Sequence, residues 1–202
     1  MRGPETRRQI VETAARLIYE QGYAATGVSQ ILAASGAGSS SLYHFFGSKE
    51  ELLAAVLDRY GERLDEEIVG PSRAATDDPI ERVFRILDFY RVLLDATGCR
   101  LGCPIGNLAG EVSDTHLWLC AKLAELFAVW RRAVASCLRE AAPRLRRGVD
   151  AEEVAVFVLA VMEGGVMQAR VERSLRPFEI SVERLREYLR SLTTETHAKE
   201  AT

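Results

Sequence analysis

The sequence predicts an all-α protein. Apolar residues recur at the three- and four-residue spacing of one face of an α-helix, and glycine or proline separates successive runs. No segment shows a convincing alternation of apolar and polar residues, which a half-buried strand would need. A chain of 202 residues that is 48% hydrophobic can bury one sizeable core and still carry a solvated surface.

Two helices are expected near the N-terminus, and the second of them is short. The first runs from Arg7 to Gln21, and Gly22 supplies its end. Thr26 and Ser29 are possible caps of the second helix, which is expected to end at Gly36.

A third short segment, from Ser39 to Phe46, precedes a longer helix. Ser48 is a suitable N-cap for that helix, whose first turn is acidic, and Gly70-Pro71 is expected to break it. We place a domain boundary inside this helix. Residues 1–58 then form a three-helix N-terminal domain, and residues 59–202 form a larger helical domain.

Four further helices are expected in the larger domain. Pro79 stands at the start of the first, and Gly98 closes it. A glycine-rich segment then leads to a long helical pattern that ends before Pro143. The last three expected ranges are Thr115–Ala142, Ala151 to about Val171, and Phe178 to about Leu192.

The two short helices joined by the turn at Ser35 to Gly38 suit a helix-turn-helix, whose second helix can enter the ~12 Å-wide major groove of DNA. The spacing alone is a weak signal, because many helical bundles join short helices through glycine. A net charge of −3 and a pI near 5.7 argue against a histone-like protein that coats DNA by long-range attraction. Any contact with DNA must therefore come from a local surface.

The residue pattern of the first quarter of the chain is far more specific than this spacing. Its most recognisable stretch is Leu-Tyr-x-x-Phe followed by Ser-Lys-Glu, between Leu42 and Glu50. The matching segment runs from Thr6-Arg7 to Tyr60, and its other matches are Gly22-Tyr23, Thr26, Ile31 and Ser35-Gly36. Together these residues resemble the N-terminal domain of the tetracycline-repressor (TetR) family of bacterial transcription regulators.

The resemblance implies a ligand-responsive repressor in which Ser39 to Phe46 is the recognition helix. Tyr43 and His44 would face the DNA backbone, and Lys49 would meet a phosphate at the N-terminus of the next helix, where free N–H groups favour anions. The residues expected to contact DNA are Thr26, Ser29, Ser39, Ser40, Ser41, Tyr43, His44 and Lys49.

The recognition helix departs from the family pattern, because many relatives have Lys-Gly where this chain has Ser39-Ser40. The loss of a base-reading cation suggests that affinity relies more on phosphate contacts. The candidates for these contacts are Arg2, Arg7, Arg8 and Lys49, although the arginines could equally be solvated surface charge.

A single recognition helix contacts too few bases for strong discrimination, so we expect a homodimer on a palindromic operator. Family members pair through their last two helices, which form a four-helix bundle. The apolar stripes that would supply this interface are Val154, Phe157, Val158, Val161, Leu185, Leu189 and Leu192. The alternative is that these stripes only close the core of the protomer.

The segment from Gly98 to Ala109, GCRLGCPIGNLA, resembles a signature of one TetR subgroup. That subgroup includes repressors of efflux, detoxification and reductase genes that respond to aromatic or reactive small molecules. Cys103 would lie at the start of a short helix, where a thiolate is favoured, and could sense electrophiles or oxidants. It could form a sulfenic acid or a disulfide with Cys99, or it could be an inert buried thiol.

The more ordinary sensor is an apolar cavity that binds a small apolar or aromatic inducer. The residues expected at such a site are Tyr90, Cys103, Asn107, Phe127, Trp130, Met162, Glu163 and Met167. The apolar members could equally be ordinary core residues, and the polar members could make structural hydrogen bonds.

Two other functions remain open at this point. A thiol-based enzyme would use Cys99 and Cys103 and would have only His116 as a base. A dimeric binding protein could hold a small molecule without regulating DNA. We predict no catalytic residue, metal site or cofactor. The sequence has no signal-peptide pattern, and no apolar segment approaches the ~20 residues of a membrane span, so a cytoplasmic location with reduced thiols is expected.

Overall fold

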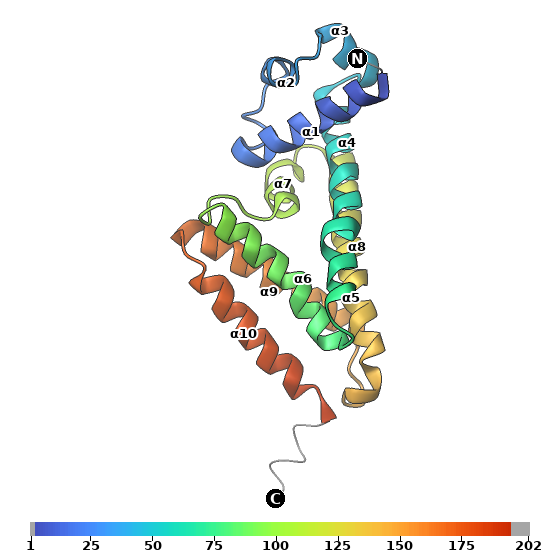
Figure 1. Ribbon diagram of the computed structural model, residues 1–202, viewed down its shortest axis with the longest axis vertical. Helices are drawn as coiled ribbons and strands as arrows, with labels where there is room; N and C mark the ends of the chain where they lie inside the picture. The colour runs from blue at the N-terminus through green and yellow to red at the C-terminus, as the bar shows by residue number, and fades with distance from the viewer. Residues whose placement is uncertain (1–2, 195–202) are drawn as a thin grey trace, which may run out of the picture. The chain divides into compact units, whose positions relative to one another are not determined.

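The computed structural model of the chain describes residues 3–194, and within that range it is helical, as expected (Figure 1). Its elements in chain order are α1 (Gly3–Gln21), α2 (Val28–Ser35), α3 (Ser39–Phe45), α4 (Lys49–Arg63), the π-helix η1 (Leu64–Val69), α5 (Gly70–Ala75), α6 (Pro79–Ala96), α7 (Pro104–Val112), α8 (Leu117–Glu140), the 3₁₀-helix η2 (Ala142–Arg144), α9 (Ala151–Glu172) and α10 (Arg176–Ser191).

The chain divides into two compact units. Unit 1 comprises Met1–Arg63 together with Pro104–Leu126, and unit 2 comprises Leu64–Cys103 together with Phe127–Thr202. By packing, therefore, α7 and the first part of α8 belong with the N-terminal helices. Nothing in the sequence pattern indicated that a segment so far along the chain would join them.

The core of unit 1 forms where α1 packs against α4. The apolar faces predicted from helical spacing point inward, and Ile10, Ile31, Leu42 and Leu53 have no exposed surface. Burial of each such side chain contributes about 1.5–3 kcal/mol. Tyr60 adds a polar tie within this core, because its hydroxyl donates to the carbonyl of Ala15 at 3.2 Å.

The helix-turn-helix is delimited by glycines. Gly27 is the N-cap of α2, and its backbone N–H donates to the side chain of Gln30 at 2.8 Å. Gly36 ends α2 in the left-handed region at φ 66°, which glycine adopts without strain. The expectation that Thr26 or Ser29 caps α2 is wrong, because the Thr26 hydroxyl instead donates to the carbonyl of Gly22.

The helical segment that begins with α4 continues past Gly70-Pro71, where the sequence predicted a break. After Arg63 it changes to the π-helix η1, and Gly70-Pro71 then opens α5. Proline is tolerated there because the first turn of a helix needs no donor from its N–H groups. At Gly70 a Cβ atom would lie 3.1 Å from the carbonyl oxygen of Asp65, so glycine permits this close approach of backbone.

Unit 2 is organised around α6, α9 and α10. Helix α6 begins at Pro79, as expected, and the Asp78 carboxylate caps it by accepting the backbone N–H groups of Ile80 and Glu81. Asp78 also accepts from Arg144 at 3.0 Å. Helices α9 and α10 pack side by side (Figure 1), and the buried Phe178 of α10 lies against Gly165 of α9.

Helix α9 contradicts the expectation that no apolar segment approaches the length of a membrane span. By length and composition it could cross a membrane, since its most apolar window has a mean hydropathy of 1.6. In this protein, however, α9 packs against α6 and α10, and the Asp150 carboxylate caps its N-terminus. The core helix of a soluble protein can have the length and composition of a membrane span, so α9 by itself is no evidence for a membrane.

Candidate functional site

Helix α3 carries five of the eight residues that the sequence analysis assigned to DNA. Ser39, Ser40 and His44 are exposed, and Tyr43 is 61% exposed. Ser41 is half-buried. On the opposite face, Leu42 has no exposed surface and fixes the helix to the core. This arrangement presents hydroxyl, phenol and imidazole groups that can hydrogen-bond to phosphates or base edges.

The two predicted contacts ahead of α3 differ from each other. Ser29 is exposed in the first turn of α2. Thr26 has no exposed surface; its hydroxyl donates to Gly22 at 2.6 Å and accepts from Gln21 at 3.2 Å. The assignment of the Thr26 side chain to DNA is therefore corrected, because a side chain without surface cannot reach a phosphate. Its place in the structure is inside the loop between α1 and α2.

Lys49 stands at the first residue of α4 and already has a partner within the protein. Its ammonium donates to the carbonyl of Tyr23 at 2.6 Å and lies 4.1 Å from the centroid of the Tyr23 ring. Burial lowers the pKa of Lys49, and the carboxylates of Glu111 and Glu50 oppose that shift. Because an ammonium has three donors, two remain for another acceptor.

Two residues that the sequence analysis did not single out for DNA binding hold the same loop. Glu111, from the last turn of α7, accepts the backbone N–H groups of Tyr23 at 2.9 Å and Ala24 at 2.6 Å. His116, just before α8, packs edge-on against the Tyr23 ring with 5.9 Å between centroids. No local signal could have found these contacts, because the two hydrogen bonds of Glu111 join positions 87 and 88 residues apart in sequence and the contact of His116 with Tyr23 is similarly distant along the chain.

Acidic groups surround the phenol of Tyr23. Burial, then the charge of Glu50 and its hydrogen bond with the phenol, raise the pKa of Tyr23 to about 12. The pKa of Glu50 is lowered, first by its own backbone N–H and then by the Ser48 hydroxyl. His116 lies 3.7 Å from the Glu50 carboxylate. The loop between α1 and α2 is thus held by α4, by α7 and by the turn before α8.

The arginines suggested as phosphate contacts lie on α1. Arg7 and Arg8 are exposed, and the Arg7 guanidinium lies 5.2 Å from the centroid of the Phe46 ring. Arg2 lies outside the described residues.

Within unit 2, several of the predicted ligand residues are core side chains. Tyr90, Trp130, Met162 and Cys103 are each 3% exposed or less. Phe127 is half-buried.

Two of the predicted ligand residues do not fit a site inside unit 2. Met167 is 66% exposed on α9, so its assignment to an enclosed cavity is wrong. Apolar periodicity could not show which side of a largely apolar helix is covered. Asn107 is half-buried on α7, which belongs to unit 1.

Two of the buried polar atoms in unit 2 have no partner. Over the described part of the chain, Trp130 Nε1 and Glu163 Oε1 are inaccessible and make no hydrogen bond. Burial raises the pKa of Glu163, and a hydrogen bond with the Cys103 thiol opposes that shift. An unpaired buried donor or acceptor costs about 1–3 kcal/mol, so each needs an explanation.

Cys99 and Cys103 are both buried, and neither forms a disulfide. Burial, followed by the charge of Asp95, raises the pKa of Cys99, which disfavours its thiolate. Cys99 has a left-handed backbone at φ 54°, and its carbonyl accepts from Arg173, which is also left-handed at φ 53°. Among the described residues, no group of three or more His, Cys, Asp and Glu side chains could hold a metal ion.

The predicted dimerisation stripes divide into two sets. Val154, Val158, Leu185 and Leu189 are at most 7% exposed within the protomer, so their assignment to a subunit interface is corrected: they belong to the core. Phe157 is 45% exposed, while Val161 and Leu192 are half-buried. The large apolar residues exposed on α9 and α10 are Val156, Phe157, Met167, Val171, Ile180 and Tyr188.

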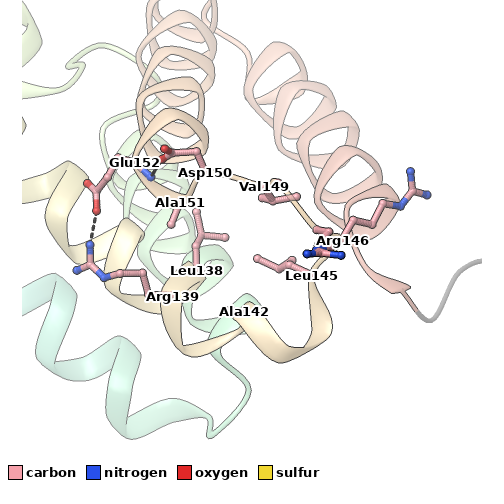
Figure 2. A pocket seen from close by; sticks show the side chains of 11 residues that line it. Leu138, Arg139, Ala142, Leu145, Arg146, Val149, Asp150, Ala151 and Glu152 are labelled. Atoms are coloured by element: carbon pink, nitrogen blue, oxygen red, sulfur yellow. Dashed lines mark hydrogen bonds and ion pairs between the residues drawn. The ribbon is translucent and has the colours of Figure 1, made fainter.

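A concave pocket of about 510 Å³ lies at the connection between α8 and α9. Figure 2 shows Leu138, Leu145 and Val149 on its wall and the ion pair between Arg139 and Glu152 at one side. None of the eight residues predicted to bind a ligand lines this pocket. The sequence analysis did not identify this pocket.

Comparison with known proteins covers nearly the whole chain. Residues 10–56 match the family described as bacterial regulatory proteins, tetR family, and residues 79–184 match the C-terminal domain described as transcriptional regulator LmrA/YxaF-like. The uncharacterized HTH-type transcriptional regulator YxaF of Bacillus subtilis is 30% identical over 184 residues, which are 90% of this chain and 93% of that protein. The regulator LmrA of the same organism is 31% identical over 86% of this chain and 90% of its own length.

A solved structure agrees with these matches. A TetR transcriptional regulator from Chloroflexus aurantiacus has a TM-score of 0.82 and 32% identity, and the match covers 95% of this chain and 97% of that one. Both halves of the sequence and the entire helical fold therefore lead to one assignment. The chain belongs to the TetR family of bacterial transcription regulators, with an N-terminal helix-turn-helix DNA-binding domain and a larger helical C-terminal domain.

Proposed function

We propose that this regulator is a homodimeric repressor that binds a palindromic operator through α3 and is released by a small apolar or aromatic ligand. The observation that carries the proposal is the division of α3 into two faces. Leu42 anchors one face in the core, while Ser39, Ser40 and Tyr43 are exposed on the other. Such a protein would act where the chromosome is, in the cytoplasm. We set aside the alternative of a thiol-based enzyme, because the TetR family consists of transcriptional regulators.

Pairing through α9 and α10 is supported by the apolar surface that they leave uncovered. Phe157 and Tyr188 come from different helices, and their rings pack edge-on with 5.1 Å between centroids. Both are at least 40% exposed, which gives a second protomer an aromatic surface to cover. The proposed interface therefore centres on these exposed residues.

The proposed inducer site lies in unit 2 and is supported by the two unpaired buried atoms there. Trp130 Nε1 can only donate a hydrogen bond, whereas the Glu163 carboxylate oxygen accepts one. A ligand that satisfies both would carry an acceptor and a donor on an apolar or aromatic body. Binding would favour a dimer geometry in which the separation of the two α3 helices no longer fits the operator.

Electrophile or oxidant sensing at Cys103 is a second candidate, supported by the Gly-Cys signature of residues 98–109. Against a permanently reactive thiolate stand its 3% exposure and its hydrogen bond with Glu163. The Cys103→Ser variant separates the two forms of sensing. It should abolish release from DNA by a quinone or hypochlorite if Cys103 is the sensor, and it should leave release by a reversible ligand unchanged.

DNA binding is tested by selecting duplexes from a random-sequence pool with the wild-type protein and measuring mobility shifts at several salt concentrations. Tyr43→Ala should weaken binding to the selected duplex at least several-fold. Val92→Ala is the matched control, because Val92 is 62% exposed on α6 in unit 2. If the wild type selects no sequence, or if Tyr43→Ala and Lys49→Ala change nothing, the repressor proposal is wrong. If the wild type selects no sequence, a dimer that binds small molecules but not DNA is the better interpretation.

A further inference from the structure

The loop between α1 and α2 is held by a side chain from far along the chain. One carboxylate, that of Glu111 in α7, accepts two successive backbone N–H groups, from Tyr23 at 2.9 Å and from Ala24 at 2.6 Å. Hydrogen bonds to an ionised acceptor are about twice as strong as those between neutral groups. Glu111 therefore makes a two-point attachment to the segment that leads directly into the helix-turn-helix.

Tyr23 is also held through its carbonyl group and its ring. The carbonyl of Tyr23 accepts from the Lys49 ammonium at 2.6 Å, and its 6%-exposed ring packs against that ammonium and against His116. Both backbone groups of Tyr23 are therefore bound by side chains of helices outside the helix-turn-helix. The loop cannot shift with respect to α4 or α7 unless these charge-assisted hydrogen bonds break.

Gly22, which ends α1, lies next to this carboxylate. Its φ of +92° belongs to a region that other residues rarely adopt, and a Cβ there would lie 3.4 Å from both carboxylate oxygens of Glu111. The positive φ is therefore what requires glycine at this position, where the backbone lies beside Glu111.

Helix α7 connects this attachment to Cys103. Its nine residues span about 13 Å at 1.5 Å per residue, beginning at Pro104, directly after Cys103, and reaching Glu111 in the last turn. Ile105 and Leu108 are buried and hold the helix in place. A short helix moves as a rigid body, so a displacement at its first turn is carried to Glu111 at the other end.

We propose that Glu111 is a positioning residue for DNA recognition, which couples the orientation of the helix-turn-helix to the position of α7. This inference rests on the proposed reading of an operator by α3. A purely structural Glu111 would stabilise the fold without affecting operator affinity per folded molecule. If Glu111 couples the two, operator affinity depends on the position of the first turn of α7.

The attachment itself is tested without DNA, by amide hydrogen exchange of Glu111→Ala in the full chain. The Tyr23 and Ala24 amides should exchange at least about tenfold faster than in the wild type. Asp114→Asn is the matched control, since Asp114 is exposed two residues beyond the end of α7 and its replacement removes the same charge. Unchanged exchange at both amides in Glu111→Ala would overturn the proposal.

The coupling is tested by a double-mutant cycle of operator affinity, with a duplex selected by the wild type as the probe. Ile105→Ala perturbs the first turn of α7 and should change operator affinity at least about fivefold in the wild type and in Asp114→Asn. In the Glu111→Ala background the same substitution should change it less than about twofold. Glu111→Gln, which retains an acceptor oxygen, should behave between these limits and serves as the variant if Glu111→Ala does not fold.

Each outcome of this cycle is decisive. If Ile105→Ala has the same effect with and without Glu111, or no effect on the wild type, α7 does not act through Glu111 and the inference is wrong. If the wild type selects no duplex, the proposed function fails instead. The exchange measurement still decides separately whether the attachment exists.

Discussion

Two adjacent glycines in α9 give a sharp test of how closely α9 and α10 pack. At Gly165 an added Cβ would lie 3.2 Å from Cδ2 of Phe178, 3.3 Å from its Cα and 3.4 Å from Cβ of Ser181. Two of these three neighbours are backbone or next to it, and Phe178 is 1% exposed, so neither side can yield easily. At Gly164 an added Cβ would meet nothing within 4 Å.

The comparison isolates the packing effect, because both substitutions to alanine gain the same helix propensity of about 0.5–1 kcal/mol. Gly164→Ala should therefore stabilise the protein by about that amount. Gly165→Ala carries an additional overpacking cost of about 1–3 kcal/mol, which is the expected difference in unfolding free energy between the two variants. For a chain of this size the melting temperature changes by roughly 2–4 °C per kcal/mol.

Urea and thermal unfolding of the two variants measure this difference. Both variants should be studied at one protomer concentration, because association contributes to apparent stability. Equal stability of the two, or a Gly165→Ala variant that is the more stable, would refute the inferred contact between the α9 backbone and Phe178. Chemical shifts of the Phe178 ring should move in Gly165→Ala and stay in place in Gly164→Ala.

Three further predictions concern other parts of the protein. Tyr60→Phe removes a buried hydrogen bond to the Ala15 carbonyl and should lower the free energy of unfolding by about 1 kcal/mol; an unchanged urea midpoint would contradict this. Phe157→Glu places a charge on the exposed apolar face of α9 and should shift sedimentation equilibrium towards the monomer, whereas Val92→Glu on α6 should not. Because burial raises the pKa of Glu163 above its ordinary value of 4.5, the folded state binds more protons than the unfolded state above that pH. The free energy of unfolding should therefore fall as pH rises from 4.5 through the folded pKa of Glu163, and Glu163→Gln should remove this fall. Parallel pH–stability curves for the wild type and Glu163→Gln would contradict the prediction.

Local sequence rules predicted the helices well and failed where distant segments meet. Pro79 begins a helix as expected, and Gly22 and Gly36 end theirs in the left-handed region, because caps depend on neighbouring residues only. The break expected at Gly70-Pro71 did not occur. The same dipeptide can open a new helical turn, and the π-helix before it left no mark in the apolar spacing.

The candidate sites show the same limit. Periodicity identifies an apolar face, but it does not say which element covers it, so Val158 and Leu189 were assigned to a dimer although they lie in the protomer core. Helix α9 is apolar on more than one side, which also explains the misplacement of Met167. Glu111 was out of reach for another reason: its partners are two backbone amides, which leave no trace in the sequence at either end of the contact.

The burial of the cysteines has a practical consequence for finding the inducer. Cys103 is 3% exposed, so a thiol reagent reaches it only when the surrounding helices open, and its labelling rate relative to that of free cysteine measures how often they do. Any small molecule that makes these helices open less often should slow the labelling of Cys103, whether or not it contacts the sulfur atom. Cys120 is only half-buried and should react first, so Cys120→Ser gives the cleaner signal. The labelling rate of Cys103 can therefore be used to screen compounds before any operator is known.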